Sequence, residues 1–155
     1  MHFVSLDTPL GKIGVFEQNE KIIRVSFSFC ENDMKLQSSC VAQNAAEQLH
    51  EYFLGKRKTF DLPISFVGVT PFRKEVYTQL MKVDYGKTVS YKDIATAISN
   101  PGAVRAVGGA LNKNPLLIIV PCHRVVGADG SLTGFACGID KKQFLLKLEK
   151  NSNQF

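Results

Sequence analysis

The chain of 155 residues is long enough for one hydrophobic core or for two small ones packed together. Apolar residues make up 45% of it and charged residues 21%, which is typical of a globular protein and excludes a disordered or fibrous one. No apolar run approaches the roughly 20 residues of a membrane helix, and the first ten residues lack the features of a secretion signal. We therefore expect a cytosolic or nuclear protein.

Positive charge is concentrated in the second part of the chain. Residues 67–155 carry 12 Lys and Arg against 6 Asp and Glu, whereas residues 1–66 carry 7 against 8. Concentrated positive charge is expected of a protein that binds a polyanion. A solvated basic surface would give the same count, so both interpretations stay open at this point.

Residues 1–66 are predicted to form an N-terminal lobe that begins with strands. Apolar residues alternate over 11–16 and again over 23–27, and the polar residues 18–21 between them form a turn. This pattern predicts a β-hairpin.

One helix is predicted to complete this lobe. Ala45, Leu49 and Phe53 recur at helical spacing, and Gly55 supplies the expected helix end. Residues 56–68 contain a proline and show little periodicity, so we place the linker between two domains there.

The C-terminal domain, residues 67–155, is predicted to begin with a helix. Thr70 is suited to cap its N-terminus, and Pro71 to occupy its first position. The apolar face of this helix would consist of Phe72, Val76 and Leu80.

Two short helices are predicted next. Ser90 and Asp93 have the spacing of a capping box, and residues 100–102 break the helix that it opens. The apolar face of that helix would consist of Tyr91, Ile94 and Ile98. A second helix follows over about 102–113, and Asn-Pro at 114–115 ends it. Two short helices around a glycine-containing turn are typical of a helix-turn-helix, and also of many ordinary helical hairpins.

The second of these helices is predicted to expose an unusually smooth face. The inward positions are Val104, Val107 and Leu111. The outward positions are Gly102, Ala106, Gly109 and Lys113, with Arg105 at the edge. An exposed glycine within a helix costs about 1 kcal/mol relative to alanine, so close approach of another backbone would explain it. That partner is either DNA, in a minor groove of only about 6 Å, or the other lobe.

A thiol and an imidazole follow a buried segment. Residues 116–120 are wholly apolar, and Pro121 ends them directly before Cys122, His123 and Arg124. The four cysteines lack the close pairing of zinc ligands, so we expect free thiols. A thiol needs a nearby base or cation to become a competent nucleophile, and neighbouring residues face each other only on an irregular backbone or through a water. A buried cysteine is otherwise usually an inert apolar residue.

The last predicted helix begins at Asp140 as its N-cap and ends near Glu149. Its inward residues would be Phe144, Leu145 and Leu148. A carboxylate in the last turn opposes the helix dipole by about 0.3–1 kcal/mol. A histidine that needs an acceptor would compensate for this, as would the neighbouring Lys147 and Lys150. Together these elements predict an α+β protein with a sheet-and-helix lobe and a mainly helical domain that carries the helix-turn-helix and the Pro-Cys-His-Arg segment.

The run Val-Pro-Cys-His-Arg-Val-Val at residues 120–126 resembles the active-site signature of the O6-alkylguanine-DNA alkyltransferases, most closely of bacterial-type members. The likeness is strong over residues 70–149 and weaker over the first lobe, where residues 8–11 and the order of hairpin and helix support it. The further matching segments are residues 70–76, 86–91, 103–109, 114–115, 134–138 and 142–146.

The resemblance implies a single-use DNA repair protein that moves an alkyl group from O6 of guanine to its own cysteine. Cys122 would attack the alkyl carbon, His123 would act as its base through a water, and Glu149 would orient His123. Asn114 would join the helix-turn-helix to the active-site segment by hydrogen bonds. Tyr91 would protonate or hydrogen-bond guanine N3 and help to rotate the nucleotide.

The resemblance also implies a partner and a pocket. The partner is double-stranded DNA that contains O6-alkylguanine, with O4-alkylthymine as a second candidate substrate, bound through its minor groove with the damaged base turned out. Arg105 would fill the gap in the base stack. The other residues expected to contact DNA are Ala106, Gly109, Lys113, Tyr91 and Arg124. The pocket would be lined by Val125, Phe135, Ala136 and Cys137. We expect a monomer that uses neither a metal nor an organic cofactor.

Two positions depart from the family pattern. Cys137 stands where glycine is usual, and Tyr77 stands where tryptophan is common. Because Cys137 would lie near the pocket wall, its side chain is expected to slow the reaction of large adducts such as benzyl.

Three other functions compete with repair. A damage sensor would bind and flip the lesion without repairing it, but such proteins replace the nucleophile, and here Cys122 is present. A transcription regulator would use alkylation of Cys122 as a signal, yet the chain shows no added effector domain. A cysteine hydrolase would need an oxyanion hole.

Overall fold

The computed structural model describes residues 1–132 and 138–152. The chain forms two compact units, Met1–Val67 with Pro115–Leu117, and Gly68–Asn114 with the chain from Ile118 onward. Strands and helices occur together, so the predicted α+β class is confirmed. Among the described residues, none of the helices combines the length and the apolar character that crossing a bilayer requires.

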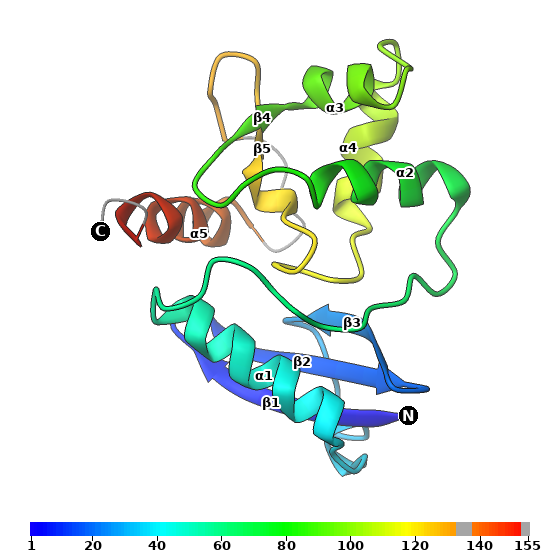
Figure 1. Ribbon diagram of the computed structural model, residues 1–155, viewed down its shortest axis with the longest axis vertical. Coiled ribbons are helices and arrows are strands. Elements are labelled where there is room, and N and C mark those ends of the chain that lie inside the picture. Colours follow the sequence, from blue (N-terminus) through cyan, green and yellow to red (C-terminus); the bar gives the residue numbers. More distant parts are fainter. Residues whose placement is uncertain (133–137, 153–155) are drawn as a thin grey trace. The chain divides into compact units, whose positions relative to one another are not determined.

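The first unit is an antiparallel sheet with a helix on it. Its elements are β1 (His2–Thr8), β2 (Gly11–Gln18), β3 (Lys21–Ser26), the 3-10 turn η1 (Asp33–Lys35) and α1 (Cys40–Phe53). β2 is the central strand, and α1 lies across one face of the sheet (Figure 1). Asn19 and Glu20 connect β2 to β3 with φ of 54° and 65°, which is the geometry of a tight hairpin turn. The predicted hairpin is therefore confirmed, and β1 extends it to a sheet.

Helix α1 has the predicted position. Ser39 caps its N-terminus by accepting a hydrogen bond from the amide of Ala42, and Gly55 follows its end with a φ of 75°. Ala45 and Leu49 are fully buried under the helix, as their spacing predicted.

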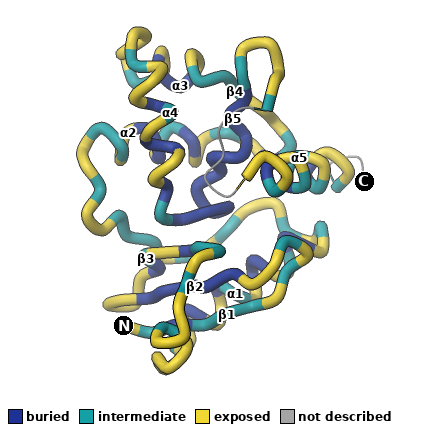
Figure 2. Tube along the Cα trace, turned by 180° about the vertical axis from the view of Figure 1, so that it is seen from behind, coloured by how far each residue is buried: buried dark blue, intermediate teal, exposed yellow. Residues whose placement is uncertain are grey.

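The segment Pro115–Leu117 belongs to the first unit because it pairs with β3. The Val25 amide donates to the carbonyl of Pro115 (2.8 Å), and the Leu117 amide donates to the carbonyl of Val25 (3.2 Å). Burial of the apolar residues 116–120 is confirmed, and it continues without interruption to residue 126 (Figure 2).

The second unit is mainly helical. Its elements are α2 (Pro71–Leu80), β4 (Val89–Ser90), α3 (Tyr91–Ala97), α4 (Val104–Asn112), the 3-10 turn η2 (Cys122–Arg124), β5 (Val125–Val126) and α5 (Ile139–Ser152). β4 and β5 form a short parallel pair, which lies beside the helices α3 and α4 in Figure 1.

The predicted starts of α2 and α3 are confirmed. The Thr70 hydroxyl accepts a hydrogen bond from the amide of Arg73 (3.2 Å). The capping box joins the Ser90 hydroxyl to the amide of Asp93 (3.0 Å) and the Asp93 carboxylate to the amide of Ser90 (2.9 Å). Helices α3 and α4 pack together around a turn that contains Gly102, so the two-helix arrangement is present.

Two predicted helices differ in detail. Val104 was expected to face the core, but it is the first residue of α4 and is 38% exposed, whereas Ala110 is buried. The first turn of a helix projects beyond its packed region, so its periodicity predicts burial poorly. Helix α5 begins at Ile139, so Asp140 lies in its first turn and is not the cap.

The inward face of α5 was also predicted incompletely. Leu145 is buried as expected, while Phe144 and Leu148 are only partly buried. Lys142 and Glu149 are buried instead. The helix therefore turns a cation and an anion inward, which helical periodicity of apolar residues cannot reveal.

Candidate active site

Cys122 begins the 3-10 turn η2 and is 2% exposed. The turn is closed by the Arg124 amide, which donates to the carbonyl of Pro121 (3.0 Å), and the Cys122 amide donates to the carbonyl of Val120 (2.8 Å). This is the irregular backbone that the adjacent cysteine and histidine require, because in a regular strand their side chains would point to opposite faces.

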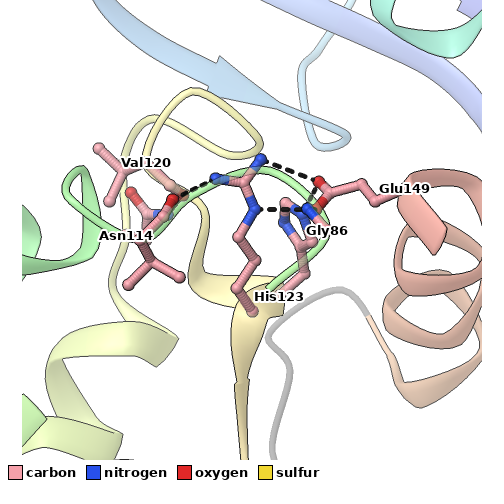
Figure 3. A network of polar contacts seen from close by, with 7 residues as sticks. Gly86, Asn114, Val120, His123 and Glu149 are labelled. Carbon is pink, nitrogen blue, oxygen red and sulfur yellow. Dashed lines mark hydrogen bonds and ion pairs between the residues drawn. The ribbon is translucent and has the colours of Figure 1, made fainter. Parts of the chain in front are cut away.

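Asn114 links the end of α4 to the segment before Cys122. It is buried, and its Nδ2 donates to the carbonyl of Val120 (2.9 Å) (Figure 3). The bond runs from just beyond α4 to the second residue before the thiol. A hydrogen bond of the implied kind is therefore present, while the hinge role of Asn114 stays a prediction.

Glu149 is the centre of a buried polar network. Its Oε2 lies 2.5 Å from Nε2 of His123, and its Oε1 accepts from the Gly86 amide (3.1 Å) (Figure 3). Arg124 adds two bonds, from Nε to Oε1 (2.9 Å) and from Nη2 to Oε2 (3.1 Å). A carboxylate offers about four lone-pair positions, and these four contacts engage both of its oxygens.

The network fixes the charge of Glu149. Burial raises the pKa of its carboxyl group, but the hydrogen bonds from His123 and Arg124 and the positive charge of Arg124 outweigh burial and hold that pKa far below its ordinary value. Glu149 is therefore an ionised carboxylate, which can only accept hydrogen bonds.

The charge of Glu149 in turn assigns the tautomer of His123. Because Glu149 only accepts, Nε2 of His123 carries the hydrogen, an assignment that follows from the network. Burial lowers the pKa of His123 below its ordinary value; Glu149 raises it and the charges of Arg124 and Lys142 lower it. His123 is thus neutral, and its Nδ1 holds the basic lone pair.

Arg124 lies elsewhere than the sequence analysis placed it. It was expected to contact DNA, but its side chain is buried, and its Nη1 donates to the carbonyl of Val83 (2.7 Å). Its guanidinium carbon also lies 5.7 Å from the ring centre of Tyr85. A guanidinium that is held by Glu149, a backbone carbonyl and an aromatic face is not available to a phosphate, which corrects that prediction.

Lys142 was missed by the sequence analysis. It is fully buried, and its Nζ lies 5.9 Å from the ring centre of Tyr91. Burial lowers the pKa of Lys142, and a negative charge on Cys122 acts in the opposite direction. The available signal was its place in the chain, because Lys142 lies seven residues, or about two helical turns, before Glu149 and hence on the same face of α5.

Tyr77 is one of the two positions at which the sequence analysis expected a departure from the family pattern. Its hydroxyl donates to the carbonyl of Ala110 (2.6 Å), which joins α2 to the last turn of α4. Burial raises the pKa of Tyr77 to about 12; the charge of Arg73 lowers it and that of Cys122 raises it. The phenol is therefore neutral, and it holds α4 in place.

The outward face of α4 has the predicted smoothness. Arg105, Ala106, Gly109 and Lys113 are exposed, and a Cβ added at Gly109 would have no described atom within 4 Å. Tyr91 is partly buried at the first position of α3. The exposure of these positions is confirmed, and their contacts with DNA stay predictions.

The predicted pocket lining is described only in part. Val125 is fully buried in β5, where it is paired with Val89. The other expected lining residues, Phe135, Ala136 and Cys137, lie outside the described residues.

Two family models match the chain. The one described as 6-O-methylguanine DNA methyltransferase, DNA binding domain, matches residues 71–151. The one described as 6-O-methylguanine DNA methyltransferase, ribonuclease-like domain, matches residues 1–66.

Relatives match over nearly the full length. A methylated-DNA–protein-cysteine methyltransferase of Methanosarcina barkeri is 41% identical over 98% of this chain and 99% of its own length. The constitutive methylated-DNA–protein-cysteine methyltransferase of Bacillus subtilis is 41% identical over 97% of this chain and 96% of its own length. The structure of Mycobacterium tuberculosis OGT in complex with DNA matches with a TM-score of 0.89 at 37% identity, covering 98% of this chain and 94% of that one. The chain therefore belongs to the 6-O-methylguanine DNA methyltransferase family.

Proposed function

We propose that this protein repairs DNA by moving the alkyl group of O6-alkylguanine onto Sγ of its own Cys122. The observation that carries the proposal is the family match over the whole chain, with the cysteine of the signature present at position 122. A bond forms between Sγ and the alkyl carbon while the bond from that carbon to O6 breaks, and the electron pair leaves with guanine. A thioether is not hydrolysed, so each molecule acts once.

His123 is the proposed base for Cys122. Its neutral state and its basic Nδ1 suit it to accept the thiol proton through a water, while Glu149 holds the opposite nitrogen. Tyr91 is proposed to protonate or hydrogen-bond guanine N3, so that the departing base does not leave as an anion. Neither step requires a metal or an organic cofactor.

The smooth face of α4 is proposed to enter the minor groove of double-stranded DNA. A helix with Ala106 and Gly109 outward presents little bulk, which suits a groove too narrow for an ordinary helix. The damaged base turns out of the stack because O6 is out of reach inside the duplex, and its weakened pairing reduces the energy needed. Arg105 is proposed to fill the gap, and Lys113 to contact a phosphate.

The second part of the chain, from residue 67, is proposed to carry both DNA binding and alkyl transfer. The excess of positive charge on residues 67–155 supports this assignment. We also propose that the protein acts as a monomer in the cytoplasm.

The range of adducts is proposed to be narrow. Cys137, which lies outside the described residues, has a Cβ and a thiol where the family usually has glycine, so benzyl should react more slowly than methyl. Equal rates for the two adducts, with Cys137→Gly no faster, would contradict this.

The decisive experiment mixes the protein with duplex DNA that contains O6-methylguanine and maps the added methyl group by peptide mass spectrometry. We expect one methyl group per molecule, on Cys122 and not on the exposed Cys30 or Cys40. Cys122→Ser should abolish transfer while it retains binding to the same duplex in a gel-shift assay. Binding without any methylation of the wild-type protein would instead indicate the damage sensor.

A further inference from the structure

Neutral His123 beside ionised Glu149 is an unusual combination. A carboxylate at hydrogen-bond distance stabilises an imidazolium, so an isolated pair of this kind tends to hold the proton on histidine. An imidazolium carries hydrogen on both nitrogens and cannot accept another. A His123 and Glu149 pair on its own would therefore place the proposed base in its inactive form.

Arg124 supplies the missing positive charge with well-defined geometry. Its planar guanidinium makes two parallel bonds to the two oxygens of Glu149, the arrangement in which arginine and carboxylate pair most strongly. A third bond to the Val83 carbonyl and the ring of Tyr85 fix the guanidinium in that orientation. Because the pair is buried, solvent screens it little.

We propose that Arg124 is a positioning residue that neutralises Glu149 and thereby keeps His123 uncharged and ready to take the proton of Cys122. The catalytic part of this proposal, in which neutral His123 takes the proton of Cys122, rests on the proposed function. With Arg124 and Glu149 as a neutral pair, an added proton on His123 would leave a net positive charge in a buried site. The proton that leaves Sγ for Nδ1 creates a thiolate and an imidazolium together, and the electron pair stays on sulfur, so the total charge of the site does not change.

Other ionisable groups also influence the protonation of His123. Cys122 and Arg124 flank His123 on η2, and Glu149 reaches it from α5. The charge of Lys142 on α5 also acts on His123, and its Nζ lies 5.9 Å from the ring centre of Tyr91. The Tyr85 ring centre lies 5.7 Å from the guanidinium carbon of Arg124, and Tyr77 interacts electrostatically with Cys122. Lys142 has the same sign of effect as Arg124, but its cation faces Tyr91, whereas Arg124 forms the ion pair with Glu149. Arg124 is therefore the cation whose removal most directly leaves Glu149 uncompensated.

The first test measures the protonation of His123 itself in the full-length protein without DNA. Nitrogen-15 spectra of the imidazole should show a neutral ring with hydrogen on Nε2 at pH 7 in the wild type. When the same spectra are followed against pH, Arg124→Gln should raise the pKa of His123 by one unit or more. The double variant Arg124→Gln with Glu149→Gln should bring the pKa of His123 back toward that of the wild type, because both charges are then absent.

The second test follows the rate of methyl transfer against pH. Transfer needs neutral His123, so the rate falls as pH drops through the pKa of that residue. Arg124→Gln should move this acid limb upward by at least one pH unit. At a given pH below the limb, the variant should therefore react about tenfold more slowly than the wild type or slower still. Arg124→Lys keeps the charge and should leave the acid limb in place, even though one ammonium replaces two parallel bonds. Lys147→Gln, which removes an exposed charge from α5, should change neither readout.

The outcomes separate this proposal from the proposed function. If wild-type Cys122 is never methylated, the repair function fails, while the imidazole spectra still report on Arg124. An unchanged pKa of His123 in Arg124→Gln, with a rate loss that is the same at every pH, would overturn the role of Arg124. Should Arg124→Gln not fold, Arg124→Lys decides, because an acid limb displaced despite the retained charge would also overturn it.

Discussion

Helices α4 and α5 belong to the same unit and present opposite kinds of surface. Helix α4 exposes small uncharged positions, Ala106 and Gly109, where a soluble helix normally carries long polar side chains. Helix α5 buries Lys142 and Glu149, where a helix normally places apolar ones. An exposed glycine within a helix and a buried charge both cost stability in general, so neither face is what folding alone would select.

Removal of the buried carboxylate should have the largest effect. Glu149→Gln leaves the guanidinium of Arg124 buried without a counter-charge, so we expect the free energy of unfolding to fall by about 3–5 kcal/mol. Urea unfolding followed by circular dichroism measures this. Glu75→Gln, an exposed change on α2, is the matched control and should stay within about 0.5 kcal/mol of wild type. A similar small loss for both variants would mean that the buried network contributes no more than a surface charge.

The next largest effect is expected from Arg105, at the edge of the smooth face of α4. Arg105→Ala should slow repair in duplex DNA by about tenfold or more, because stacking against a base is worth about 1–3 kcal/mol. The same variant should react with free O6-methylguanine base nearly as fast as wild type, since that substrate needs no flipping. Lys147→Ala removes an equal charge from an exposed position of α5 and controls for loss of general attraction. Equal losses of Arg105→Ala on both substrates would exclude the stacking role.

Acid should weaken the buried network in two stages. In the unfolded chain histidine takes up a proton below about pH 6.5, whereas folded His123 has a lowered pKa and stays neutral there. Between these two pKa values the unfolded state binds more protons, so the free energy of unfolding falls by up to about 1.4 kcal/mol for each pH unit of acidification. Glu149, whose folded pKa is also lowered, contributes stability that is present above about pH 4.3 and is lost below it. Unfolding in urea between pH 7 and 5 measures the first stage, and His123→Asn should flatten it. An unchanged slope in that variant would assign the acid sensitivity to other groups.

The contrast between the exposed face of α4 and the buried charges of α5 also explains what could be predicted from the sequence. Caps and turns depend on neighbouring residues, so the roles of Thr70, Ser90 and Gly55 in ending or beginning helices followed from local patterns. The smooth face of α4 was likewise visible as a periodicity. Arg124 and Lys142 are different, because a long cationic side chain is buried only when distant groups receive it. Their partners are on a loop and on other helices, and no local pattern records those contacts.

Gly109 offers the smallest and most direct test of the comparison. Its backbone is helical, and an added Cβ would meet no described atom within 4 Å, so Gly109→Ala should stabilise the free protein by about 1 kcal/mol through helix propensity alone. If the face is shaped by a groove of DNA, the same methyl group should weaken binding to duplex, and Gly109→Leu should weaken it further. Thermal unfolding and fluorescence anisotropy measure the two effects on the same samples. A more stable Gly109→Ala that binds duplex as tightly as wild type would leave the smooth face without a function in DNA binding, and would confine the evidence for function to the buried network.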